Sequence, residues 1–242
     1  MTLRAFGSLF GVRHGEQSPQ VLALHGWGRT RSDFDRLLDG SRAIALDLPG
    51  FGASPAPDES LGAAGYARLV EPILNEFDSP PVVVGHSFGG RVAVALAASR
   101  PDLVAGLVLV GVPLLRPTGA GRKPSIAYRL VRLGARLGVI APERLEAARR
   151  RYGSADYRAA TGVMRDILVK VVNESYEKEL AGLRCPVRLV WGDQDLEAPL
   201  ELARVAVELV GDGRLDIVYD AGHNIHLTHP ERVQAAIDEL LE

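Results

Sequence analysis

Short apolar runs alternate along the chain with longer segments of helical periodicity. The runs are rich in Val, Ile and Leu without strict polar alternation, which is typical of strands buried on both faces. They lie at residues 20–24, 43–46, 81–84, 107–110, 187–191 and 215–219. Helices are expected at residues 33–38, 61–76, 88–99, 200–210 and 230–241. This order predicts an α/β fold with a mostly parallel, doubly wound sheet, which antiparallel edge strands within residues 3–13 bring to about eight strands.

The segment from Pro113 to Lys178 interrupts this alternation. It contains no convincing strand, but it has helical patterns at residues 126–137, 143–152 and 161–176. Glycines at 119 and 121 and a proline at 124 indicate a flexible entry. We therefore expect a helical cap at residues 113–178, inserted before the late strands of a core formed by residues 1–112 and 179–242.

The predicted cap is basic. It carries fourteen Lys and Arg against six Asp and Glu, a net charge of +8, whereas the rest of the chain carries 14 basic and 24 acidic residues. Arg129, Arg132 and Arg136 fall three and four residues apart, so they would share one helix face. The ordinary interpretation is a solvated surface. The alternative is a docking surface for an anionic partner or substrate.

Composition restricts the class of protein. The chain has 242 residues, 47% hydrophobic and 24% charged, as expected of one globular domain. The net charge of −2 argues against a nucleic-acid partner. Cys185 is the single cysteine, so no intrachain disulfide can form, which fits a reducing compartment. No secretory signal and no apolar run long enough to span a bilayer are visible, so we expect a soluble, cytoplasmic protein without a membrane partner.

The strongest chemical signal is Gly85–Gly89, which reads G-H-S-F-G and matches G-x-S-x-G. It follows an apolar strand and precedes a helical pattern, the context in which a sharp turn lifts a serine into an exposed, strained position. Ser87 is therefore the candidate nucleophile.

A second signal is the loop at His25–Gly28, which reads H-G-W-G and follows the strand at 20–24. A loop of this kind can offer a backbone N–H to the oxyanion of a tetrahedral intermediate, and the residue after the nucleophile offers another. We assign the oxyanion hole to the N–H groups of Trp27 and Phe88. His25 is expected to be a structural histidine of the loop.

Two further signals follow late strands. Asp193 and Asp195 come after the strand at 187–191, and His223 comes after the last strand. A serine hydroxyl needs a base to take its proton, and the base needs a carboxylate to fix its tautomer. Either aspartate could be that carboxylate.

These motifs together resemble the α/β-hydrolase fold family, over nearly the whole chain. They occur in the family's order: 25–28, 47–54, 85–90, 192–195 and 222–223. The resemblance implies that Asp195, the last residue of G-x-x-D, is the acid, that His223, directly after a glycine, is the base, and that Asp193 caps the loop. The turn at 47–52 would be structural.

The other histidines and the cysteine receive non-catalytic roles. His226 is expected to line the substrate pocket, His229 to begin the last helix before Pro230, and His86 to be packed away from Ser87. No H-E-x-x-H or Cys/His spacing supports a metal site, and no cofactor is expected. Cys185 is expected to be inert.

The residue type at position 87 restricts the class of reaction. Dehalogenases and epoxide hydrolases of this family carry Asp at the elbow, whereas Ser87 implies acyl transfer. The resemblance thus implies hydrolysis of a small carboxylic ester or thioester. Motifs 25–28 and 47–52 are similar to those of pimeloyl-acyl-carrier-protein methyl ester esterases, which would suit an anionic or carrier-linked substrate. Two alternatives stay open: a C–C bond hydrolase of ring-cleavage products, and a ligand receptor that keeps the triad.

Overall fold

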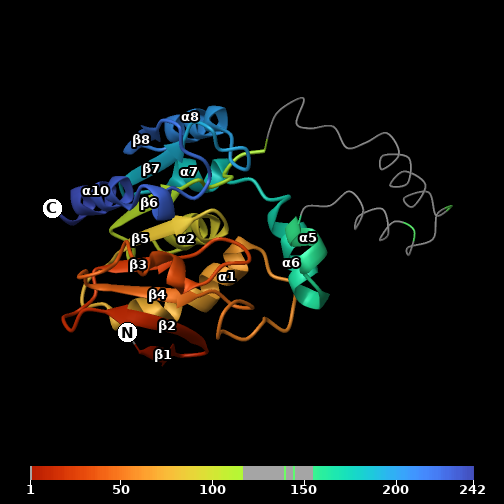
Figure 1. The fold of residues 1–242 in the computed structure, drawn as a ribbon, viewed down its shortest axis with the longest axis horizontal. Coiled ribbons are helices and arrows are strands. Elements are labelled where there is room, and N and C mark those ends of the chain that lie inside the picture. The colour runs from red at the N-terminus through yellow and green to blue at the C-terminus, as the bar shows by residue number, and fades with distance from the viewer. Residues whose placement is uncertain (1, 117–138, 140–143, 145–154) are drawn as a thin grey trace.

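The structure is a computed structural model that describes residues 2–116, 139, 144 and 155–242 (Figure 1). The helix expected at 126–137, with Arg129, Arg132 and Arg136, lies outside the described residues. So does the helix expected at 143–152, apart from Arg144.

Eight strands form one sheet in the order β1-β2-β4-β3-β5-β6-β7-β8. The first three strands of this order pair antiparallel, and every later pair is parallel. This confirms the mostly parallel sheet with antiparallel edge strands. The strands are β1 Leu3–Phe6, β2 Leu9–His14, β3 Val21–Leu24, β4 Ala43–Asp47, β5 Val82–His86, β6 Gly106–Val110, β7 Val187–Gly192 and β8 Gly213–Val218.

Helices cover both faces of the sheet, and each face has its own hydrophobic core. Successive strand residues point to opposite faces, so Val83 of β5 joins one core while Val82 and Val84 join the other. The first core includes α1 Ala63–Val70, η2 Glu71–Glu76, α2 Phe88–Ser99, α7 Glu177–Gly182 and α8 Leu200–Glu208. The second includes η1 Arg31–Phe34, α9 Ile225–Thr228 and α10 Pro230–Leu241.

The helix expected at residues 61–76 is present in two parts. It is α-helical from Ala63 to Val70 and continues as the 3-10 helix η2 from Glu71. Pro72 lies at the start of η2, and a proline inside an α-helix lacks the N–H donor and clashes with the carbonyl four residues earlier. The change of helix type at Pro72 follows from that clash.

Helices are inserted between β6 and β7, as the sequence predicts (Figure 1). Within the described residues these are α5 Ala155–Ala159, α6 Gly162–Val171 and α7. The helix expected at 161–176 ends at Val171. Beyond it, the Glu174 carboxylate accepts hydrogen bonds from the Ala63 N–H at 3.1 Å and the Tyr176 hydroxyl at 2.6 Å, while the Tyr176 N–H donates to the Leu114 carbonyl at 3.0 Å. These tertiary bonds replace the helical ones.

The candidate chemistry gathers where the parallel strands end. Ser87 directly follows β5, Asp195 lies three residues beyond β7, and His223 follows β8. Because the carboxyl ends of parallel strands meet at one edge of the sheet, residues far apart in sequence converge there. No helix among the described residues is both long and apolar enough to cross a membrane.

Candidate active site

Ser87 occupies a strained turn between β5 and α2. Its φ is 49°, in the left-handed region that non-glycine residues rarely adopt, and its side chain is partly exposed. The turn is possible because the strand and helix approach closely: a Cβ at Gly89 would overlap the Leu24 carbonyl. The Ser87 N–H donates to the Val110 carbonyl of β6 at 3.0 Å, which fixes the turn to the sheet.

Asp195 and His223 are joined by a hydrogen bond of 2.8 Å between Oδ2 and Nδ1. The Asp195 side chain is buried, and its other oxygen accepts the N–H groups of Glu197 and Ala198, each at 2.8 Å. Since a carboxylate only accepts, the neutral imidazole carries its proton on Nδ1 and leaves the lone pair of Nε2 free. That is the tautomer of a general base.

Two features of the surrounding chain bear on this pair. The indole N–H of Trp191, the buried fifth residue of β7, donates to the Ala198 carbonyl at 2.6 Å and ties the Asp195 loop to the sheet. Gly111 follows β6 with a φ of +53°, and a Cβ there would lie 3.1 Å from both Asp195 Oδ2 and His223 Nδ1. The chain can pass this close to the pair only because Gly111 has no side chain.

Asp193 has a different environment from Asp195. Its side chain is exposed, and its backbone N–H donates to the Val218 carbonyl of β8 at 3.1 Å. The structure therefore pairs His223 with Asp195 and leaves Asp193 at the surface of the loop.

The loop after β3 lies against the elbow. A Cβ at Gly26 would be 3.4 Å from the Ser87 Cβ, and the rings of Trp27 and Phe88 meet edge to face at 5.4 Å. The N–H groups of Trp27 and Phe88 donate no hydrogen bond to any group in the described part of the chain. The loop that carries Trp27 thus lies against the elbow, and both N–H groups are without an acceptor among the described residues.

His25 has both ring nitrogens engaged in the buried loop. Nδ1 donates to the Gly26 carbonyl at 2.7 Å, and Nε2 accepts the Leu48 N–H at 2.9 Å. Burial lowers the pKa of His25, although the bond to Gly26 opposes that shift. A neutral histidine with two fixed partners is structural, in line with the sequence interpretation.

The Ser87 hydroxyl and the His223 imidazole are not hydrogen-bonded to each other in the described structure. No bond joins Ser87 Oγ to His223 Nε2 among the residues that the structure describes. Nε2 instead lies 3.6 Å from the carboxylate of Glu197, an exposed side chain. Catalytic hydrogen bonds of unliganded enzymes are often long and shorten when substrate binds.

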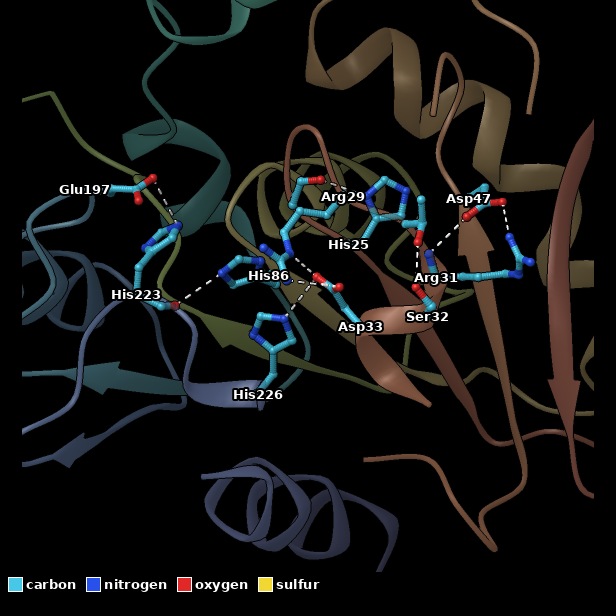
Figure 2. A network of polar contacts seen from close by, with 12 residues as sticks. His25, Arg29, Arg31, Ser32, Asp33, Asp47, His86, Glu197, His223 and His226 are labelled. Atoms are coloured by element: carbon cyan, nitrogen blue, oxygen red, sulfur yellow. Dashed lines mark hydrogen bonds and ion pairs between the residues drawn. The ribbon is translucent and has the colours of Figure 1, made fainter. Parts of the chain in front are cut away.

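A buried network behind His223 was not expected from the sequence (Figure 2). His86 Nε2 lies 3.2 Å from the His223 carbonyl oxygen, and the His86 ring packs on the His226 ring with centroids 4.0 Å apart. His226 Nε2 lies 3.5 Å from Asp33 Oδ2, and Asp33 forms an ion pair with Arg29. No sequence motif points to this network, because its members come from three separate segments.

The structure gives His226 another place than the one expected. Its side chain has no exposed surface and packs between His86 and the Phe34 ring, whose centroid is 5.4 Å away. We therefore assign His226 to the network behind His223 and not to the wall of a substrate pocket. His229 occupies the N-cap position of α10 directly before Pro230, although its side chain makes no capping hydrogen bond.

Burial and charge set the protonation of the network. Burial holds the pKa of His86 well below its usual value, with the nearby His226 and His223 acting in the same direction. Burial also lowers the pKa of His226, against the opposing effect of Asp33. Burial alone would raise the pKa of Asp33, but hydrogen bonds from His226 and Arg29 outweigh it and lower the pKa to about 2. Two neutral imidazoles thus lie beside one carboxylate.

Apolar side chains lie next to the elbow. Trp27 and Phe51 are half-buried and meet at 5.0 Å, and the buried Phe88 contacts the Tyr66 ring at 4.9 Å. The Tyr66 hydroxyl lies 3.9 Å from the sulfur of Met164 in α6, so this inserted helix contacts the cluster. No group of three or more His, Cys, Asp or Glu side chains within the described ranges is arranged to hold a metal ion.

Comparisons with known proteins agree with this fold. A family model described as "Alpha/beta hydrolase family" matches residues 21–236. A pimeloyl-acyl-carrier-protein methyl ester esterase of Aromatoleum aromaticum is 29% identical over 252 residues, covering 92% of this chain and 98% of that protein. An esterase of Mycobacterium tuberculosis is 38% identical over 110 residues, 44% of this chain and 37% of that protein. A solved thermophilic esterase from Thermogutta terrifontis has the same fold, with a TM-score of 0.68 at 23% identity over 96% of this chain and 93% of that one.

Proposed function

The chain belongs to the alpha/beta hydrolase family, and from that premise we propose that it is a serine hydrolase that cleaves a carboxylic ester or thioester through an acyl-serine intermediate. One observation carries the proposal: the buried Asp195–His223 hydrogen bond of 2.8 Å lies at the same sheet edge as a serine held at a φ of 49°. A strained serine, a base of the correct tautomer and a buried acid are the parts that acyl transfer needs.

Acylation would use these parts in order. The Ser87 Oγ attacks the substrate carbonyl carbon while His223 Nε2 takes the hydroxyl proton, and Asp195 stabilises the imidazolium that forms. The carbonyl oxygen becomes an oxyanion, which the N–H groups of Trp27 and Phe88 stabilise. The C–O or C–S bond then breaks, and the leaving alcohol or thiol takes the proton from His223.

Deacylation would run through the same groups. A water molecule gives a proton to His223 Nε2 and attacks the acyl carbon, and the second oxyanion occupies the same two N–H groups. The bond to Ser87 breaks, Oγ takes the proton back, and the carboxylic acid leaves. Over the whole cycle one water molecule is consumed, and Ser87 and His223 return to their starting protonation states.

Three features support an acyl substrate that is anionic or carrier-linked. The apolar cluster of Trp27, Phe51 and Phe88 lies beside the elbow and would suit an acyl chain. The relative from Aromatoleum aromaticum is named for a methyl ester on an acyl carrier protein. The net charge of +8 over residues 113–178 would favour such a partner electrostatically.

The test replaces the nucleophile. Ser87→Ala should abolish labelling by a fluorophosphonate and lower kcat for p-nitrophenyl esters by roughly 10⁴-fold or more. Ser99→Ala is the matched control, because Ser99 lies at the other end of α2 and its hydroxyl donates only to the Leu96 carbonyl. Labelling of the Ser87→Ala protein at the wild-type rate would place the nucleophile elsewhere.

The wild-type protein distinguishes the alternatives. Steady turnover of p-nitrophenyl esters of graded chain length supports the esterase. Turnover of a ring-cleavage dienone with little ester turnover would support C–C hydrolysis instead. A single slow turnover, with a large rise in Tm on ligand binding, would support a receptor.

A further inference from the structure

We propose that His86 is a positioning residue, whose ring N–H holds the main chain of His223 in register with the neighbouring Ser87. The inference rests on the proposed function, because it concerns the geometry of that triad. His86 is the last residue of β5 and the residue directly before Ser87. Its Nε2 lies 3.2 Å from the His223 carbonyl oxygen, a hydrogen bond that spans 137 residues of sequence.

This bond links the base to the nucleophile by a short route. His223 is held at its side chain by Asp195, which comes from the loop after β7. It is held at its main chain by His86, which adjoins the nucleophile covalently. Because the two anchors act at opposite ends of the same residue, together they fix both the place and the direction of the imidazole. Asp195 alone would fix only its Nδ1.

The proton on His86 can be assigned from its partners. A carbonyl oxygen only accepts, so Nε2 carries the hydrogen and donates it. Nδ1 has no hydrogen-bond partner within the described residues, and it faces Gly26, where a Cβ would lie 2.7 Å from it. A second proton on this buried, unpartnered nitrogen would place a positive charge away from water, and burial accordingly holds the pKa of His86 well below its usual value. His86 therefore stays neutral and adds no positive charge beside the imidazolium that His223 becomes in the transition state.

The far side of the His86 ring is braced. The His226 ring packs against it at 4.0 Å with an interplanar angle of 37°, and Asp33 and its partner Arg29 anchor His226 in turn. Figure 2 shows this sequence of contacts running from His223 to Arg29. Ring rotation of His86 would have to displace a fully buried neighbour. The ring is thereby locked in the orientation that bonds His223.

The side chain of His86 is 1% exposed, so it acts through His223 and not on substrate. Loss of its N–H should therefore lower kcat and leave KM nearly unchanged. A displacement of reacting groups by about 1 Å can cost roughly 100-fold in rate. That sets the upper end of the expected effect.

The test compares two substitutions of similar length. His86→Gln places an amide N–H where Nε2 lies, whereas His86→Met fills a similar volume without a donor. We expect His86→Gln to retain most of the kcat for p-nitrophenyl acetate and His86→Met to lose roughly 10- to 100-fold, with KM within about twofold in both. The rate of fluorophosphonate labelling of Ser87 should follow kcat. Equal kcat for the two variants, high or low, would overturn the proposal.

Further measurements distinguish a loss of catalysis from a loss of folded protein, and failure of this inference from failure of the proposed function. Thermal unfolding of both variants shows whether a loss of kcat merely follows a loss of folded protein. If His86→Met does not fold, His86→Phe replaces it, since it keeps a buried ring without a donor and must show the same kcat loss against His86→Gln. Failure of the proposed function looks different, because the wild-type protein would then neither label at Ser87 nor turn over esters.

Discussion

At the scale of single residues, Asp193 and Asp195 share one loop but differ in burial and partners. Asp195 accepts three hydrogen bonds, one of them from His223, while Asp193 is exposed. Asp195→Asn should lower kcat by roughly 10⁴-fold, because the amide favours the wrong tautomer of His223. Asp193→Asn should leave kcat close to the wild-type value. Steady-state kinetics of both variants, with circular dichroism as the folding control, measure the difference, and the reverse ranking would overturn the assignment.

The sequence predicts some site residues much better than others. Ser87 lies in a motif of its own, whereas Asp195 and His223 are selected by the family resemblance, and the structure bonds these two to each other. The His86 bond to the His223 carbonyl follows no motif. It depends on the final approach of strand ends that are remote in sequence, and a buried histidine in a strand is more often simply packed. The sequence also does not predict the burial of His226, which depends on contacts with the loop that carries Asp33.

At the scale of elements, hydrophobic periodicity predicted the strands and the long helices, and it failed where tertiary contacts decide short segments. The helix expected at residues 33–38 is the 3-10 turn η1, whose Arg31 binds Asp47 and whose Asp33 binds Arg29. A single helical turn gains few backbone hydrogen bonds, so these ion pairs decide the local conformation. The helices α5, α7 and α9 are each six residues or shorter and gave too few turns for a periodic signal.

The contact between α2 and the inserted helices yields an element-scale prediction. Arg91 of α2 is buried and donates to the Pro113 carbonyl at 2.9 Å and to the Val171 carbonyl at the end of α6. Arg91→Met leaves the Pro113 carbonyl without this donor, so it should reduce the free energy of unfolding by about 1–3 kcal/mol. Urea denaturation measures the change.

Arg100→Met provides the matched control for Arg91→Met. Arg100 follows α2 and pairs with Glu71 and Asp102 at the surface, where ion pairs contribute little to stability. Its effect on the free energy of unfolding should be clearly smaller. Equal losses for the two variants would mean that the buried donor has no special role in docking the inserted helices.

At the scale of the whole molecule, burial of neutral imidazoles couples folding to pH. His14, His25, His86 and His226 are all buried, and burial is the largest cause of the lowered pKa of each. His25 and His86 lie where β3 and β5 end, whereas His14 ends β2, which runs antiparallel to β4, and so lies at the opposite edge of the sheet. The coupling therefore belongs to the fold and not only to the site.

The sign of that coupling follows from proton binding. A histidine whose pKa is lower in the folded chain binds fewer protons there than in the unfolded chain below about pH 6.5. The free energy of unfolding should thus be constant above about pH 7 and fall as pH drops through 6.5, by up to about 1.4 kcal/mol per pH unit for each histidine that only the unfolded chain protonates. Asp33, with its pKa lowered to about 2, loses its contribution only below about pH 4, outside this range.

The measurement is urea denaturation at intervals between pH 8 and pH 5, with His14→Phe as the test variant. Neither ring nitrogen of His14 has a hydrogen-bond partner in the described part of the chain, so a buried apolar ring can replace it without leaving a broken bond. The variant should match or exceed the wild-type stability at pH 5, and its slope should be shallower by up to one proton. Ester hydrolysis at pH 8 should not change, because His14 lies at the end of β2 that pairs with the start of β4, away from Ser87. A wild-type stability that stays flat down to pH 5 would show that the buried histidines accept protons without unfolding, and so that their neutral state is not required by the fold.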